Sequence, residues 1–105
     1  MSSSPTQSAT ASYNLEFDSR AHKEYRKLEP TLRLQLAKKL KARLAQPRVE
    51  KDRLNNMADC YKIKLRSAGY RLVYQVIDQR VVVLVIAIGK RERCDVYSVA
   101  SARLN

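Results

Sequence analysis

The sequence has little of several residues that many functional sites require. Glycine occurs twice, histidine once and cysteine twice in 105 residues, and tryptophan is absent. Two isolated glycines exclude a glycine-rich phosphate loop. Two cysteines without a C-x-x-C motif, and a single histidine, provide neither a disulfide framework nor a zinc site. We therefore expect no metal and no cofactor, and we expect Cys60 and Cys94 to be buried or half-buried thiols.

Long apolar runs are also missing. The longest is VVVLVIAI at 81–88, which is too short to span a membrane as a helix. The N-terminus lacks the basic region and apolar stretch of a signal peptide. The sequence therefore predicts a cytoplasmic protein without a membrane partner.

Acidic residues are scarce relative to basic ones. Ten Asp and Glu face 21 Lys and Arg, which gives a formal net charge of +11. This excess favours a polyanionic partner, either nucleic acid, an acidic protein or anionic lipid, although a basic protein without such a partner stays an alternative. The length suits one domain. Residues 1–12 carry no charge and predict a disordered tail, which leaves 13–105 as the folded domain.

Hydrophobic periodicity predicts the elements of that domain. Apolar residues recur every three or four positions after Asp18 and again after Pro30, as in amphipathic helices, and they alternate from Cys60 onward, as in strands. The predicted order is a strand at 13–17, helices at 19–28 and 30–46, strands at 60–66, 70–77 and 81–88, and a short helix at 95–104. This is a small α+β domain of order β-α-α-β-β-β-α, with an N-terminal strand and a helical hairpin packed on an antiparallel β-sheet.

Cations and tyrosines are concentrated in the C-terminal half. Lys62, Lys64 and Arg66 alternate with apolar residues, so they share one face of their strand. Further members of the set are Arg71, Lys90, Arg91 and Arg93, with Tyr61, Tyr70, Tyr74 and Tyr97 interleaved. One face of the sheet is expected to gather most of them. Positive charge beside aromatic rings is what single-stranded nucleic acid requires.

The same residue types permit the cleavage of RNA. Because RNA carries its own nucleophile, the 2′-hydroxyl, cleavage requires only a base, cations for the transition state and help for the leaving oxygen. Lysine is a poor base at its ordinary pKa, but crowding by like charges lowers that pKa. Lys62 and Lys64, beside Arg66 and Arg71, are placed for such a shift. The alternative is a solvated strand face that binds phosphate without chemistry.

The segment DCYKIKLRSAGYRLVYQVIDQRVVVLVIAIGKRERCDVYS closely resembles the RelE-type toxins of bacterial toxin–antitoxin pairs. The resemblance extends from about Tyr13 to Leu104 and includes FDSRAHKEYRKL and LNNMADCYKIKLR. It implies a metal-independent endoribonuclease that enters the ribosomal A site and cuts the mRNA codon there.

The resemblance also implies roles for individual residues. The motif YKIKLR places the functional lysines at Lys62 and Lys64, which would take the 2′ proton. Arg71 of GYRLVY would stabilise the transition state, Arg91 of GKRER would serve the leaving group, and Tyr97 of VYS would stack on the base. Arg66, Lys90, Arg93, Lys38 and Lys41 are expected to contact RNA.

The family further implies partners. A RelB-like antitoxin would hold the toxin inactive, with displacement of the last helix and of Tyr97 as one mode, and operator DNA would be contacted only through the antitoxin. Two other readings stay open: a ParE-like toxin that inhibits DNA gyrase by binding, and a basic RNA-binding module without chemistry. The retained lysines, arginines and Tyr97 favour the ribosome-dependent nuclease.

Overall fold

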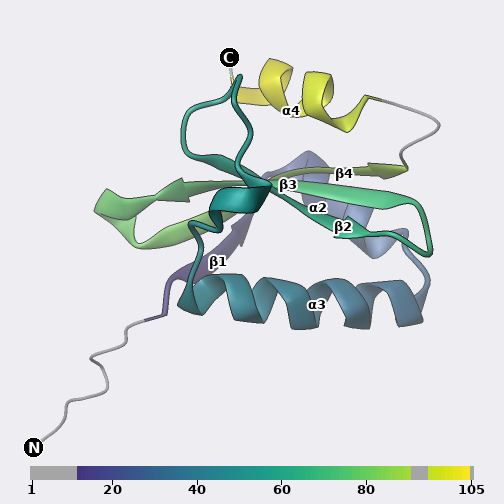
Figure 1. Ribbon diagram of the computed structural model, residues 1–105. Coiled ribbons are helices and arrows are strands. Elements are labelled where there is room, and N and C mark those ends of the chain that lie inside the picture. The colour runs from purple at the N-terminus through teal and green to yellow at the C-terminus, as the bar shows by residue number, and fades with distance from the viewer. Residues whose placement is uncertain (1–11, 91–94, 105) are drawn as a thin grey trace, which may run out of the picture.

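The computed structural model describes residues 12–90 and 95–104 (Figure 1). Its helices and strands follow the predicted order. They are β1 (Asn14–Phe17), α2 (Ser19–Arg26), α3 (Pro30–Ala45), β2 (Cys60–Leu65), β3 (Tyr70–Ile77), β4 (Val82–Lys90) and α4 (Val96–Leu104), with short 3₁₀ turns η1 (Glu50–Asp52) and η2 (Asp78–Arg80). The predicted tail at 1–12 lies outside the described residues except for Ser12.

The strands form a four-stranded sheet in the order β1-β4-β3-β2. The predicted antiparallel meander of β2, β3 and β4 is confirmed. β1 pairs in parallel with β4, so the complete sheet is mixed. Alternating polarity predicts a strand and its buried face but not the direction of its neighbour, which is why the sequence did not indicate this pairing. The apolar strand β4 lies between two others, as expected for a run buried on both faces.

Helices cover the two faces of the sheet unequally (Figure 1). α2 and α3 pack on what we call the closed face, and α4 packs on the opposite one, the α4 face. The closed-face core contains Ala21, Leu28, Leu36, Leu40, Tyr61, Ile63, Leu65, Leu72, Tyr74, Val76, Val83, Val85 and Ile88. The smaller α4-face core contains Met57, Cys60, Val73, Ile86, Ala87, Val96 and Ala100. The predicted packing of both hairpin helices on one face is confirmed.

A β-bulge in β4 changes which side chains face each core. Val73 pairs with Ala87 but Tyr74 pairs with Val85, so Ile86 is an extra residue on β4. Ile86 and Ala87 consequently both face the α4-face core. Beyond the bulge the alternation of β4 is inverted relative to the residues before it.

Local signals account for the helix starts. The Asp18 carboxylate accepts a hydrogen bond from the backbone N–H of Arg20 at 2.9 Å and so caps α2. Pro30 occupies the first turn of α3, where its missing N–H costs nothing. None of the helices in the described part of the chain is long and apolar enough to cross a membrane.

Candidate active site and nucleic-acid interface

Strand β2 carries its lysines toward the α4 face. Tyr61 and Ile63 are buried in the closed-face core, and Lys62 and Lys64 alternate with them. Cys60 precedes Lys62 by two residues, so its side chain points to the same face of the strand as the lysines, and it is buried in the α4-face core. Both lysines are half-buried. The predicted pair therefore stands side by side on the sheet face that α4 covers only in part.

Arg71 joins this pair from the neighbouring strand. In the β2–β3 register Arg71 lies directly opposite Lys64, which places their Cβ atoms about 5 Å apart. Arg71 is half-buried, and its side chain points to the same face of the strand as that of Val73, which faces α4. Like charges directly opposite each other destabilise a sheet. The fold thus concentrates three cations where packing alone does not require them.

Tyr97 lies on the same side of the sheet. It packs from α4 against the core that contains Cys60 and Val73, and it is half-buried. It also lines a pocket of about 360 Å³ with the amide side chains of Asn55 and Asn56. An aromatic ring beside amides is suited to stacking a nucleobase and bonding to its edge. Arg91 and Arg93 precede α4 and lie outside the described residues.

The crowded cations affect the protonation of Lys64. Repulsion from Lys62 is the main cause that lowers the pKa of Lys64, with smaller contributions from partial desolvation and from Arg66 and Arg71. Asp52 acts in the opposite direction. The predicted effect of crowding is thus confirmed at Lys64. A lower pKa raises the fraction of this amine that is unprotonated and therefore able to accept a proton.

The tyrosines behave differently from the prediction. Tyr61 and Tyr74 are 1% and 0% exposed, and their rings stack 5.7 Å apart in the closed-face core. Tyr70 packs on the same core. The expected row of aromatic platforms is therefore wrong, and of these four tyrosines only Tyr97 lies on the α4 face. Buried tyrosines need hydrogen-bond partners, and the Tyr74 hydroxyl donates to the Pro47 carbonyl at 2.6 Å.

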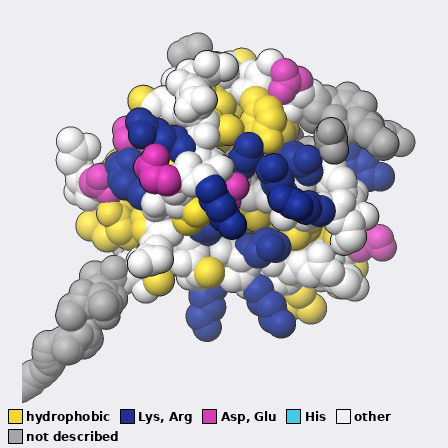
Figure 2. All heavy atoms as spheres, in the orientation of Figure 1, with side chains coloured by type: hydrophobic (Ala, Val, Ile, Leu, Met, Phe, Trp, Pro, Cys, Tyr) yellow, Lys and Arg dark blue, Asp and Glu magenta, His cyan; other side chains and the backbone are white. Residues whose placement is uncertain are grey.

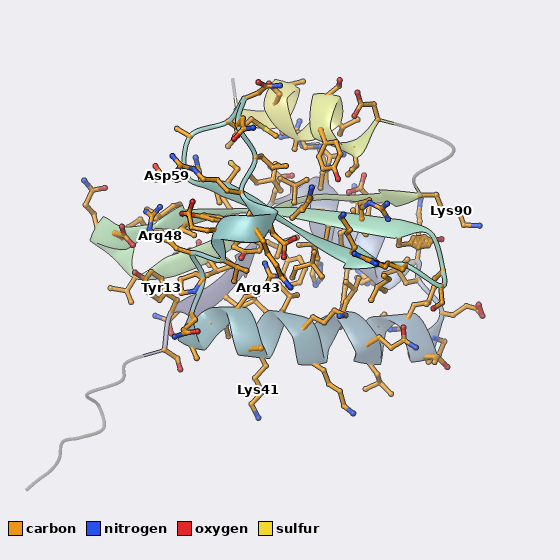
Figure 3. The ribbon with its side chains drawn as sticks, in the orientation of Figure 1. Tyr13, Lys41, Arg43, Arg48, Asp59 and Lys90 are labelled. Carbon is orange, nitrogen blue, oxygen red and sulfur yellow. The ribbon has the colours of Figure 1, made fainter. Side chains whose placement is uncertain are left out.

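The predicted RNA contacts are spread over several surfaces. Arg66 is exposed in the turn after β2, close to the lysine pair. The β4 bulge turns Lys90 to the closed-face side, where its ammonium lies 5.7 Å from the centre of the Tyr70 ring, so its expected grouping with Lys62 and Lys64 is wrong. Lys38 and Lys41 are exposed on α3, and Lys41 points away from the sheet (Figure 3). Their RNA contacts stay predictions.

Arg43 is a residue that the sequence analysis did not single out. Its guanidinium donates to Asp52 at 2.6 Å, to the Tyr74 hydroxyl at 2.9 Å and to the Lys62 carbonyl at 3.1 Å (Figure 3). Arg43 thus joins α3 and η1 to the strand that carries the lysines. Its spacing was the available signal, since it follows buried Leu36 and Leu40 by seven and three residues.

Lysine and arginine side chains gather at the exposed edge of the sheet. Figure 2 shows them across the front of the molecule, in the region between α3 and α4. A pocket of about 430 Å³ lies in this region and is bounded by α3, η1 and β2. Lys64 and Arg66 line it, so the pocket adjoins the lysine pair.

Other reactive groups are few in the described part of the chain. Residues 12–90 and 95–104 hold no group of three His, Cys, Asp or Glu side chains placed to bind a metal. Cys60 is fully buried, and burial raises its pKa to about 11, so it is protonated near neutral pH and is not a nucleophile. Cys60 is thus a buried thiol as predicted, whereas Cys94 lies outside the described residues.

Comparison with known proteins shows the family. The sequence model of the family described as "ParE toxin of type II toxin-antitoxin system, parDE" matches residues 15–94. The mRNA interferase toxin RelE of Escherichia coli strain K12 is 63% identical over 92 residues, which are 88% of this chain and 97% of that one. The chain belongs to the RelE-type toxins of the RelE/ParE superfamily.

Solved RelE structures agree with this assignment. A free E. coli RelE variant with two arginines replaced by alanine has a TM-score of 0.82 and 60% identity, covering 90% of this chain and 99% of that one. The RelE chain of the intact E. coli RelBE toxin–antitoxin complex has a TM-score of 0.75 and 64% identity, covering 77% of this chain and 99% of that one. The fold described above is therefore the RelE fold.

Proposed function

We propose that this RelE-type toxin is a ribosome-dependent endoribonuclease that cuts mRNA in the ribosomal A site and thereby stops translation. The observation that carries the proposal is the placement of Lys64, which lies beside Lys62 and opposite Arg71 with a lowered pKa. The 63% identity to an mRNA interferase supports the same reaction.

The proposed reaction uses the 2′-hydroxyl of the RNA as the nucleophile. Lys64, assisted by Lys62, takes the 2′ proton. The 2′ oxygen then bonds to the adjacent phosphorus, and the bond from phosphorus to the 5′ oxygen breaks as that oxygen takes up a proton from water. The products are a 2′,3′-cyclic phosphate and a 5′-hydroxyl. No step requires a metal ion.

The remaining residues stabilise and orient the substrate. Arg71 offers its positive charge to the phosphorane-like transition state. Arg91 would act on the leaving oxygen by its charge, because an arginine rarely gives up a proton. Tyr97 would stack on a base of the codon, with Asn55 and Asn56 at the rim of its pocket.

We further propose that a RelB-like antitoxin neutralises the toxin in the cytoplasm. The E. coli RelBE complex supports this partner. An acidic amphipathic segment suits a protein of net charge +11. Displacement of α4 would carry Tyr97 away from the lysines. The complex would repress its own operon, with DNA bound through the antitoxin alone.

The test is cleavage in a purified translation system. Ribosomes are stalled with a defined codon in the A site. The protein is then added in a buffer that has been freed of other metal ions and contains only the magnesium that ribosomes need. The ends of the mRNA fragments are mapped. We expect a cut within the A-site codon, a cyclic phosphate end, and little cleavage of the same mRNA without ribosomes. Rapid cleavage of free RNA would contradict the proposal.

The gyrase alternative is tested in parallel, because the matched family model is described as ParE. Supercoiling of relaxed plasmid by purified gyrase is measured with increasing protein. Inhibition of supercoiling without A-site cleavage would replace the nuclease by a gyrase inhibitor. Binding of RNA without either activity would leave a binding module.

A further inference from the structure

The pocket between α3, η1 and β2 has an excess of positive charge, because it is lined by several cationic side chains and one carboxylate. Its charged lining comprises Lys39, Arg43, Lys51, Asp52, Lys64 and Arg66. Asp52 pairs with Arg43, and their side chains are only 15% and 16% exposed. Among the described residues, the other four cations of the pocket form no ion pair. The pocket therefore favours an anion.

The wall of the pocket is fixed by Arg43. Because its guanidinium also donates to the Lys62 carbonyl and the Tyr74 hydroxyl, it holds α3, η1 and β2 at set positions. The lysines that surround the pocket are thus mounted on elements that the core keeps in place. A site preorganised in this way loses less entropy when an anion binds.

The lining also indicates which kind of anion fits. The apolar contributions come from Ala42 and Ile63, and Ile63 is only 1% exposed. An acidic amphipathic protein segment needs large apolar anchors as well as charge, and the exposed apolar side chain in this lining is the small Ala42. A phosphodiester needs cationic donors alone, which lysine and arginine supply.

We propose that this pocket holds a backbone phosphate of the RNA strand next to the one that is cut. The inference rests on the proposed nuclease function and adds a substrate subsite to it. Lys64 links the two places, because it stands beside Lys62 on the α4 face and also lines the pocket. A strand whose scissile phosphate lies at Lys64 reaches the pocket with a neighbouring phosphate. The subsite fixes the register of the strand and contributes to binding rather than to the chemical step.

The first experiment uses the variant Lys39→Gln/Lys51→Gln, which removes two pocket cations and leaves the lysine pair intact. The matched control is Lys23→Gln/Lys27→Gln, which removes the same charge from exposed positions in α2 and at its C-cap, behind the sheet (Figure 1). We expect the pocket variant to raise KM for A-site cleavage about tenfold, with kcat unchanged. The affinity of the pocket variant for the ribosome–mRNA complex should also depend less on salt: the slope of log affinity against log salt concentration should be smaller in magnitude by about one than that of the control. Equal effects of both variants would overturn the proposal.

The second experiment identifies the phosphate. Single neutral methylphosphonates are introduced at each linkage in and beside the A-site codon. One substitution near the cut should raise KM for the wild-type protein and have little further effect on the pocket variant, because both remove the same contact. If no linkage shows this coupling, the pocket binds something other than the substrate strand and the proposal is wrong. Selective loss of antitoxin affinity without coupling would likewise overturn it.

A third measurement needs no cleavage. Inorganic pyrophosphate is titrated into the free protein, and the amide signals of Ala42 and Ile63 are followed by NMR. We expect saturable shifts in the wild type and the control, and their loss in the pocket variant. Absence of these shifts overturns the anion site itself. A wild-type protein that binds pyrophosphate here but cuts no mRNA would instead refute the proposed function and the RNA subsite with it.

Discussion

The two faces of the sheet are built by the same strands but are covered to different extents. On the closed face, α2 and α3 bury the strands with residues such as Ala21, Leu36 and Leu40. On the α4 face, Val96 and Ala100 cover the central strands, and the lysines of β2 stay half-exposed. Stability is therefore concentrated on one face, and the candidate chemistry occupies what α4 leaves open on the other.

Strand β2 contributes to both faces through alternate residues. Ile63 belongs to the closed-face core and Lys64, its neighbour, to the open part of the α4 face. Substitutions one residue apart should consequently have different effects, one on activity and the other on stability. This separation gives four tests, ordered by the size of the expected effect.

The largest effect is expected for Lys64→Ala. Loss of the proposed base should reduce A-site cleavage about 10²–10⁴-fold. Ribosome binding should persist, and the melting temperature should not fall, because removing Lys64 relieves repulsion among like charges. Single-turnover cleavage, ribosome pelleting and thermal unfolding measure these three quantities. A loss of ribosome binding as large as the loss of cleavage would mean that Lys64 only holds phosphate.

Ile63→Ala should do the reverse. Deleting a side chain that is 1% exposed costs about 2–5 kcal/mol of unfolding free energy, because it removes buried apolar area and leaves a cavity. Urea unfolding measures this change. At a temperature where the variant is folded, its kcat for cleavage should stay within a few-fold of the wild type. A folded Ile63→Ala protein without activity would show that the two faces are not separable.

Two arginines sharpen the comparison at the edge of the sheet. Arg43 bonds to the hydroxyl of Tyr74, and Arg48 bonds to that of Tyr61 at 3.3 Å. Arg43 also holds the Lys62 carbonyl, whereas the other partners of Arg48 are exposed Asp59 and Asp78. Arg43→Met should destabilise by about 1–3 kcal/mol because it leaves Asp52 with its charge unpaired.

Arg48→Met is the matched control and should cost at most about 1 kcal/mol, since exposed ion pairs contribute little. Cleavage by the folded Arg43→Met protein should also fall, because the backbone of the lysine strand loses its clamp, and cleavage by Arg48→Met should not. Urea unfolding and single-turnover cleavage separate the two variants. Equal losses of activity would remove Arg43 from the positioning of the site.

The sequence allowed the elements, their order and the lysine face to be predicted, because alternation in β2 and leucine spacing in α3 are local signals. It did not reveal the inward turn of Arg43, whose partners Asp52 and Tyr74 lie in other elements, nine and 31 residues further along the chain. It also misplaced Lys90, because one extra residue at the β4 bulge exchanges the faces of everything after it.

Tyr61 and Tyr74 illustrate the same limit in a different way. Their alternation with cations resembles a stacking surface, but strand parity assigns them to the face opposite the lysines. The tyrosine side chains suggested an exposed stacking surface, whereas their positions in the strands place them in the closed-face core. The family resemblance supplied the residue roles that neither alternation nor composition contains, and those roles are what the Lys64 and pocket variants test.

The smallest predicted effect concerns pH, to which the two faces should respond at opposite ends of the scale. The hydrogen bond from Arg20 lowers the pKa of Asp18, the cap of α2, to about 2. Its stabilising contribution is therefore complete above its ordinary pKa of about 3.9 and is lost as pH falls toward 2. The pKa of Lys64 is lowered chiefly by Lys62, so the unfolded chain holds that proton more tightly and the contribution of Lys64 to stability rises with pH toward about 10.4. Cys60, whose pKa is raised by burial, contributes in the opposite direction over the same range.

Two variants isolate these contributions in urea unfolding measured from pH 2 to 10. Asp18→Asn keeps a capping oxygen but cannot titrate, so it should cost less than about 1 kcal/mol at neutral pH and flatten the acid limb of the stability curve. Lys64→Met should remove the rising contribution, so that stability falls more steeply at alkaline pH, and should leave the acid limb unchanged. If Asp18→Asn left the acid limb as steep as in the wild type, other carboxylates would control acid unfolding, and the closed face would not depend on the α2 cap.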